Sequence, residues 1–110
     1  MTLGEDIKAQ VKSVREKLGT DCTIDSVSIG KCGYEDLTPS QAQGVLGSDY
    51  MDEISSPWAM IECDPDTDVV EGKLITVTAT GKDWIVRRVL NTQAAGVLIG
   101  KRCLCYGKLV

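Results

Sequence analysis

The chain is 110 residues long and carries a net charge of −4, from twelve Lys and Arg against sixteen Asp and Glu. It contains no histidine, which excludes an imidazole base and every histidine-ligated metal site. It also lacks phenylalanine, and its acidic pI of about 4.7 argues against binding to nucleic acid, for which proteins normally present basic surfaces. A chain of this length forms one domain, and we expect residues 1–110 to fold as a single unit.

Charge is sorted along this domain. Residues 21–72 hold twelve acids and a single base, Lys31, whereas residues 73–110 hold seven bases and a single acid, Asp83. The middle section therefore carries −11 and the final third carries +6. Surfaces of opposite sign either neutralise each other within one molecule or meet between identical molecules, and a head-to-tail contact that repeats produces rings or filaments.

The sequence shows no signal for a membrane or for secretion. No apolar run approaches the roughly 20 residues that a membrane-spanning helix requires. The first ten residues carry Glu5 and Asp6, where a secretion signal needs bases and an apolar core. We therefore expect cytoplasmic synthesis and no association with a membrane.

Residues 1–20 have the pattern of an amphipathic helix that spans about residues 3–18. Thr2 and Glu5 have the spacing of a capping box, and Gly19 stands where a C-terminal cap belongs. Four apolar residues follow at helical spacing on one narrow stripe: Ile7, Val11, Val14 and Leu18. We expect the helix to dock onto the rest of the domain by the edge that carries this stripe.

Residues 21–34 are predicted to form the early strands. The β-branched side chains of residues 22–29 predict one strand, and Gly30 and Gly33 interrupt the pattern around a second short strand at 31–34.

Residues 35–56 are the least regular part of the sequence, and we expect a long acidic loop there. Within it, Thr38-Pro39 begins a pattern typical of a helix, which Gly44 and Gly47 limit to about two turns. A connection of this length is usually functional or mobile, and the alternative is a solvated surface loop.

Residues 57–110 alternate between strand and turn signals, as in a β-meander. We expect strands at 58–63, 74–79, 84–90 and 97–109, the last with a bulge at Gly100, and turns at 64–68, 71–72, 80–83 and 91–96. The predicted fold is mainly β with one N-terminal helix. It is either a small antiparallel β-barrel or a strongly curled meander, with the helix plugging or flanking one end.

Five cysteines occur without a CxxC pair, at Cys22, Cys32, Cys63, Cys103 and Cys105. We interpret them as small buried apolar residues in a reducing compartment, and the alternative is a zinc site built from scattered thiolates. Cys103 and Cys105 are expected on the same face of a strand because they are two residues apart.

The remaining motifs do not indicate catalysis. Asp64 to Asp68 has the spacing that opens a calcium loop, but Val69 replaces the required Gly and Ile75 the required Glu, so we expect a turn that caps its own N–H groups. The adjacent acids at 35–36 and 52–53 are expected to be solvated and ionised. No nucleophile or phosphate-binding motif is present. We therefore expect no enzymatic activity, no cofactor, no metal and no small-molecule substrate.

Arg87 and Arg88 lie in the middle of a predicted strand, so alternation sends their guanidinium groups to opposite faces. We expect them to pair with the acidic section, within or between subunits; the alternative is that both reach solvent. Trp58 and Trp84 are expected in the core. The interface residues that we predict are acidic or apolar positions of the loop and basic positions of the last strands: Asp36, Asp49, Tyr50, Met51, Asp52, Glu53, Ile54, Arg87, Arg88, Lys101 and Arg102.

The order of these signals resembles the phage lambda-type head–tail joining family, also called head-completion or neck proteins. Four features match in order: the helix ending at 18–20 with its following strand, the segment 33–36, the segment 55–57 before a strand and an acidic turn, and the closing strands 71–77 and 84–89 with the turn at 94–96. Lys73 stands where Asp is common in that family.

The resemblance implies a virion structural protein with a small β-barrel and an N-terminal helix. Members assemble as a ring beneath the portal, the tail docks on that ring, and DNA passes through the lumen without specific binding. Separate acidic and basic sections suit such a ring. Each ring contact joins two different surfaces, and opposite charges on these surfaces give the contact its direction. The alternative that we keep is a monomeric SH3- or OB-like adaptor that binds one protein or peptide.

Overall fold

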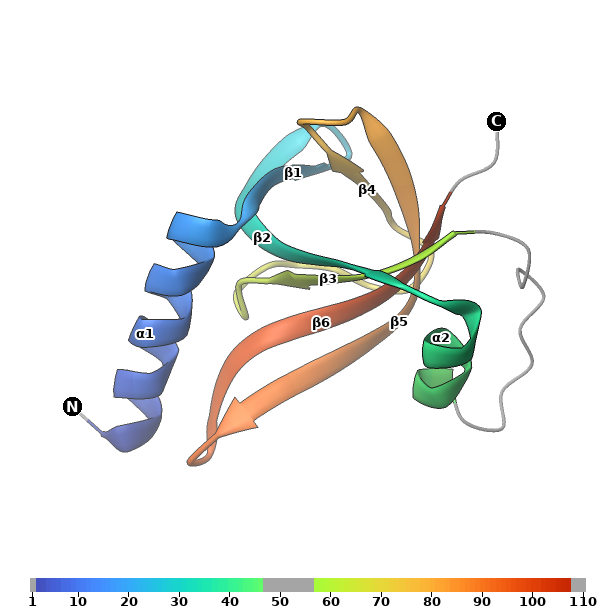
Figure 1. Ribbon diagram of the computed structural model, residues 1–110. Coiled ribbons are helices and arrows are strands. Elements are labelled where there is room, and N and C mark those ends of the chain that lie inside the picture. Colours follow the sequence, from blue (N-terminus) through green and yellow to red (C-terminus); the bar gives the residue numbers. More distant parts are fainter. Residues whose placement is uncertain (1, 47–56, 108–110) are drawn as a thin grey trace.

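The structure is a computed structural model that describes residues 2–46 and 57–107. Its six strands close an antiparallel barrel in the order β1-β2-β3-β6-β5-β4. The strands are β1 Thr20–Ile24, β2 Val27–Leu37, β3 Trp58–Cys63, β4 Leu74–Val77, β5 Lys82–Ala94 and β6 Val97–Gly107. Two helices, α1 Leu3–Leu18 and α2 Pro39–Leu46, lie outside the barrel (Figure 1). The predicted fold class is confirmed, with the closed barrel as its form and with a second short helix.

The early strands differ from the prediction because a tight turn divides residues 22–29. Asp25 and Ser26 both have positive φ, at 52° and 68°, as a two-residue hairpin turn requires. β1 therefore ends at Ile24. Gly30, with φ of 82°, does not end a strand but lies at a bulge opposite Cys22, where the register between β1 and β2 shifts.

The long loop predicted at 35–56 is wrong for residues 35–37, which belong to β2, whereas the short helix predicted within it is present as α2. β2 continues to Leu37, because residues 33–37 pair with β3, and α2 follows directly. The predicted helix start is confirmed by a reciprocal cap. The N–H of Thr38 donates to Oε1 of Gln41 at 2.8 Å, and the N–H of Gln41 donates to Oγ1 of Thr38 at 3.2 Å.

The closing strands follow the predicted order with shifted ends. β3 has the predicted bounds, whereas β4 ends at Val77 and the next turn spans 78–81, closed by a 2.8 Å bond from the N–H of Gly81 to the carbonyl of Val77. β5 continues to Ala94, so the predicted turn at 91–96 shrinks to Ala95 and Gly96. The bulge predicted at Gly100 is confirmed, since the register between β5 and β6 shifts there.

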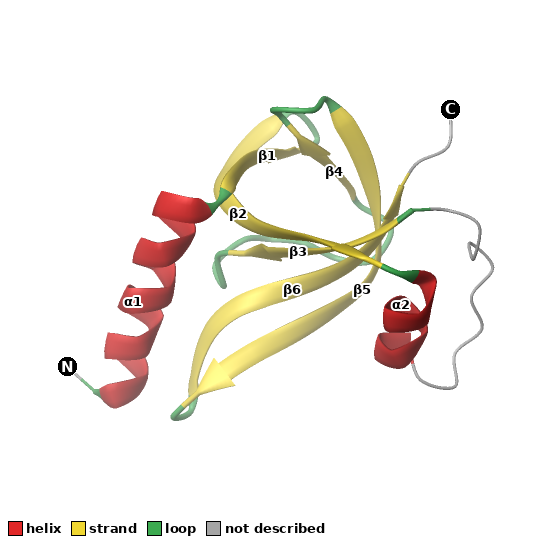
Figure 2. Ribbon diagram, viewed as in Figure 1, coloured by secondary structure: helices red, strands yellow, loops and turns green. Residues whose placement is uncertain are grey.

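Figure 2 shows both helices, in red, outside the strands of the barrel. Apolar side chains form two clusters, one on each face of the barrel wall. The interior cluster contains Trp84 and all five cysteines, which are free thiols with no exposed surface. This confirms the interpretation of the cysteines as buried apolar residues. The outer cluster joins α2 to the barrel wall and consists of Ala42, Leu46, Trp58, Met60 and Leu104. Both tryptophans are 1% exposed, as the prediction of core positions requires.

Helix α1 has the predicted bounds, and the N–H of Glu5 donates to Oγ1 of Thr2 at 3.2 Å. Its docking face agrees with the predicted stripe only in part, since Ile7 and Val11 are half-buried. The buried residues are Gly4 and Arg15, whereas Val14 and Leu18 of the apolar stripe are 55% and 83% exposed. The first turn approaches the β5–β6 hairpin so closely that a Cβ on Gly4 would lie 2.9 Å from the Ala94 carbonyl oxygen, so the contact requires glycine.

Candidate functional site

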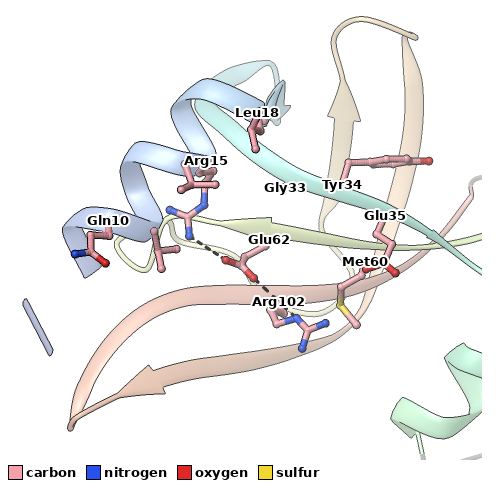
Figure 3. Close-up of a pocket in the computed structure, with 12 residues that line it drawn as sticks. Gln10, Arg15, Leu18, Gly33, Tyr34, Glu35, Met60, Glu62 and Arg102 are labelled. Carbon is pink, nitrogen blue, oxygen red and sulfur yellow. Dashed lines mark hydrogen bonds and ion pairs between the residues drawn. The ribbon is translucent and has the colours of Figure 1, made fainter. Parts of the chain in front are cut away.

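A groove of about 580 Å³ lies between α1 and the outer face of strands β2, β3 and β6 (Figure 3). Val14 and Leu18 form its apolar wall on the helix. Its floor carries one apolar side chain and three charged ones, from Met60, Glu35, Glu62 and Arg102. A concave surface of mixed character, bordered by exposed apolar residues, is typical of a protein-binding site.

Arg15 anchors α1 at the end of this groove. It is 6% exposed, and its Nη2 donates to Oε1 of Glu62 at 3.1 Å and to the carbonyl of Ile99 at 3.3 Å. Gly100 leaves the room for this contact, because a Cβ there would lie 3.1 Å from Nη2 of Arg15. Arg15 was not among the predicted site residues. The available signal was a long cation on the same helix face as Gly4, beside the apolar stripe.

Glu62 lies between two guanidinium groups (Figure 3). Besides Arg15, its carboxylate contacts Nε of Arg102 at 3.9 Å, and the Arg102 side chain is 45% exposed. Arg102, which was predicted at an interface, thus lies on the groove floor and already pairs with an acid of its own chain. This ion pair gives the floor fixed charges of both signs next to the apolar wall.

Asp36 lies on the exposed part of β2, and its Oδ1 accepts a 2.6 Å hydrogen bond from the Tyr34 hydroxyl. Burial and this hydrogen bond raise the pKa of Tyr34, so its hydroxyl stays protonated at neutral pH. The Tyr34 ring meets Trp84 edge to face, with 5.8 Å between the ring centroids. The predicted interface acid is therefore held in place by a neighbour packed against the core.

A bulge at Arg87 interrupts the regular alternation from which Arg87 and Arg88 were predicted to face opposite sides. Val86 pairs with Cys105 and Arg88 pairs with the next residue of β6, Leu104, which leaves Arg87 as the extra residue. Leu104 belongs to the outer cluster, so Arg88 lies on the outer face. There its Nη1 donates to the carbonyls of Val45 and Leu46 at 3.3 and 3.4 Å. Both carbonyls lie in the last turn of α2, where the helix itself supplies no donor for them.

Lys101 has a structural contact within the chain. Its Nζ donates to the carbonyl of Thr67 at 2.7 Å, which ties the acidic turn after β3 to strand β6. The other predicted interface residues, Asp49, Tyr50, Met51, Asp52, Glu53 and Ile54, lie outside the described residues.

The opposed charges of the sequence are neutralised in part within one molecule. Lys73 contacts Asp25 at 3.1 Å, and the Arg102–Glu62 pair also joins the cationic third to the acidic section. Within the described residues of the acidic section 21–72, five acids form no ion pair: Glu35, Asp36, Asp66, Asp68 and Glu71. All five are exposed, so the surface retains an excess of negative charge that is available to a partner.

The acidic turn is built as the capping interpretation predicts, since the N–H of Asp66 donates to Oδ1 of Asp64 at 3.0 Å. In the described part of the chain, no three acids or cysteines gather in a geometry that fits a metal ion. Burial raises the pKa of Cys105, and a hydrogen bond to Cys63 followed by burial raises that of Cys103.

Comparisons with protein-family models, with curated proteins and with solved structures found no match to this chain. Neither of the two described helices has the length and the apolar composition that crossing a bilayer requires. The site is therefore interpreted from its own geometry: a groove with an apolar wall, a charged floor and exposed acids nearby.

Proposed function

We propose that the protein is a structural subunit that assembles with copies of itself and joins two different protein neighbours, as phage head–tail joining proteins do. The observation that carries the proposal is the exposed apolar edge of α1 beside the groove, where Leu3, Val14 and Leu18 are 68%, 55% and 83% exposed. Apolar side chains gathered beside a concave surface are typical of protein contacts. The barrel with an N-terminal helix outside it agrees with the fold that the sequence resemblance implies.

In this proposal the copies form a ring beneath a portal complex, and a tail docks on the opposite side. The protein then resides in the neck of the virion, and DNA passes through the lumen. The exposed carboxylates of Asp66, Asp68 and Glu71 suit such a channel, because phosphates find no counter-charge on an acidic surface. The role requires no catalysis, no cofactor and no membrane contact.

A monomeric adaptor with an SH3- or OB-like barrel is the second candidate. The observation in its favour is the internal pairing of charge, since Lys73 and Arg102 already contact Asp25 and Glu62 of their own chain. Charge that is neutralised within one molecule no longer attracts a second copy, so the electrostatic stabilisation of an oligomer is smaller. In this case the groove beside α1 binds a segment of one partner protein.

Gel filtration with light scattering separates the two candidates. The full chain is measured at low and high salt, alone and with purified phage portal and tail proteins. The structural subunit is expected to form a larger species of fixed mass with the portal complex. A protein that stays monomeric and ignores both portal and tail rings contradicts the proposal and favours the adaptor.

A further inference from the structure

The five buried thiols of the barrel interior include one pair at the end of strand β3. Cys63, the last residue of β3, is paired in register with Lys101, and Cys103 of β6 is paired with Ile61. The two cysteines are therefore diagonal neighbours on adjacent strands, and both belong to the interior cluster. Their side chains are hydrogen-bonded to each other. The two sulfur atoms are thus in contact across the β3–β6 ladder.

A second pair of the same kind lies across strands β1 and β2. Cys22 and Cys32 have the same diagonal offset in register, and their side chains are also hydrogen-bonded to each other. The remaining thiol, Cys105, donates to the carbonyl of Cys103 at 3.4 Å. The interior therefore holds two thiol pairs of similar geometry, and each serves as a control for the other.

The surroundings of Cys63 favour a thiolate. The hydrogen bond from Cys103 lowers the pKa of Cys63, whereas burial opposes this shift. The hydroxyl of Thr67 and the positive charges of Arg15 and Lys101 lower it further. Cys103 keeps its proton, because the same hydrogen bond and burial raise its pKa. The pair therefore combines a sulfur that readily becomes a nucleophile with a protonated neighbour.

The surroundings of Cys22 are less favourable to a thiolate. The hydrogen bond from Cys32 lowers the pKa of Cys22, but burial and nearby negative charge, including that of Asp21, oppose this shift. Reactive cysteines lie in electropositive surroundings, whereas cysteines buried among apolar groups are inert. The two pairs thus differ in the charges that face their sulfur atoms, and Cys63 has the more reactive environment.

Cys63 also lies next to a part of the surface that can open. It has no exposed surface itself, but the turn at 64–68 follows it directly. A single side chain, Lys101, ties this turn to β6, through a 2.7 Å bond from its Nζ to the carbonyl of Thr67. A second groove, of about 580 Å³, borders the turn and is lined by Asp64 and Thr67. Local opening of such a turn admits small solutes from the groove to the thiol below it.

We propose that Cys63 and Cys103 form an oxidation site at which a hydroperoxide converts the two thiols into a disulfide that joins β3 to β6. This chemistry is independent of the proposed function, because it applies to a ring subunit and to a monomeric adaptor alike. In a virion, the reaction would follow release of the particle from the reducing cytoplasm of the host.

The reaction takes place in two balanced steps. The Cys63 thiolate attacks one oxygen of hydrogen peroxide, so that an S–O bond forms, the O–O bond breaks and hydroxide leaves, to be neutralised by the proton that Cys63 released. The sulfur of Cys103 then attacks the resulting sulfenic acid. An S–S bond forms, the S–O bond breaks, and the departing hydroxide takes the proton of Cys103 as water. Two thiols are thereby oxidised to one disulfide, and one peroxide is reduced to two waters.

Peroxide treatment of the reduced, folded full chain tests the site. Free thiols are alkylated after unfolding, and peptide mapping by mass spectrometry identifies the bridged residues. We expect one bridged pair, Cys63 with Cys103, that is about 2 Da lighter than its two reduced peptides and is separated by dithiothreitol. Bridging of Cys22 and Cys32 should be at least about tenfold slower. Five free thiols after treatment, a sulfinic acid in place of the disulfide, or equal rates in the two pairs overturn the inference.

Single substitutions separate this pair from the other interior cysteines. Cys63→Ala and Cys103→Ala should each abolish the bridge. Cys105→Ala removes another thiol with no exposed surface and should still allow the bridge to form. Circular dichroism shows which variants are folded, and the wild-type peptide map decides where an alanine variant is not. Absence of the bridge from a folded Cys105→Ala variant contradicts the assignment of the pair.

Thr67→Val tests the activation of Cys63 by the turn. The substitution removes the hydroxyl that bonds to the sulfur and preserves the shape of the side chain, so bridging should become about fivefold slower. Thr78→Val, in an exposed turn, is the control and should leave the rate unchanged. Equal rates in the wild type and both variants contradict the activation. None of these outcomes bears on the proposed function, which is tested by assembly and binding.

Discussion

The inner and outer faces of the barrel wall are covered in different ways. The inner face is filled by a continuous apolar cluster in which Ile61, Ile75 and the five cysteines have no exposed surface. The outer face is covered in part by α2, and beside α1 it remains open as a groove. The difference indicates that the interior supplies stability, whereas the outer face is free to serve contacts with other proteins.

The two helices show how this division arises. α2 docks with its apolar residues Ala42 and Leu46, as an amphipathic helix normally does. α1 buries a glycine and an arginine, Gly4 and Arg15, beside two half-buried apolar residues, and it leaves the apolar residues of its last turns exposed. Close approach and hydrogen bonds supply part of its docking, so these exposed residues remain available to a partner.

The largest expected effect is on the inner face. Ile61→Ala removes a side chain with no exposed surface and should lower the free energy of unfolding by about 3–4 kcal/mol. The matched change on the open outer side, Leu18→Ala, should alter it by less than about 0.5 kcal/mol. Urea unfolding measures both values. Similar losses in the two variants would contradict the contrast between the faces.

Arg15 should give the next largest effect. Arg15→Ala leaves the Glu62 carboxylate, half-buried, with only the more distant Arg102, and it should destabilise the protein by about 2 kcal/mol. The exposed Lys12 on the same helix is the control, with an expected loss near zero for Lys12→Ala. Hydrogen exchange should also increase across α1 in the Arg15 variant. Unchanged protection of α1 would show that apolar contacts alone hold the helix.

The buried thiol of Cys105 should make stability fall in alkaline solution. Burial raises the pKa of Cys105 above its unfolded value of about 8.5, so its contribution is complete below that pH and is lost as the pH rises toward the folded value. The free energy of unfolding should therefore decrease between about pH 8.5 and 11. Cys105→Ala should lower the starting stability but flatten this decrease, and an equally steep pH dependence in that variant would contradict the assignment.

Local signals in the sequence predicted much of the fold. The caps at Thr2 and Thr38 fixed two helix starts, and β3 was predicted with its bounds. The turn at Asp25-Ser26 was missed because neither residue is glycine, which is the usual sign of positive φ in a tight turn. The extension of β5 to Ala94 was missed because polar residues such as Asn91 resemble a turn, whereas pairing with β6 makes them strand.

The candidate site was harder to predict because it depends on contacts between distant segments. Arg15 acts through Glu62, which lies 47 residues away, and nothing in the helix pattern indicates that partner. The bulge at Arg87 interrupts the expected alternation, and only the pairing with β6 reveals it. Asp36 and Arg102 were predicted at an interface from charge alone, and the structure places both on β strands beside open surface.

The smallest expected effect on stability accompanies a clear effect on association. Val14→Ser and Leu18→Ser, made together, replace exposed side chains of the groove wall and should change the unfolding free energy by less than about 1 kcal/mol. Binding to the portal complex should weaken, since the wall loses its apolar surface. The exposed Val27, on the β1–β2 hairpin, provides Val27→Ser as the control. Equal binding by all variants would show that the groove takes no part in the contact with the portal complex.

Negative-stain electron microscopy of the wild-type protein, alone and with a purified phage portal complex, tests the central claim most directly. Our account predicts closed rings in which every subunit has the same orientation around one axis, and which disperse as the salt concentration rises. Single barrels, or pairs related by a two-fold axis, would contradict it.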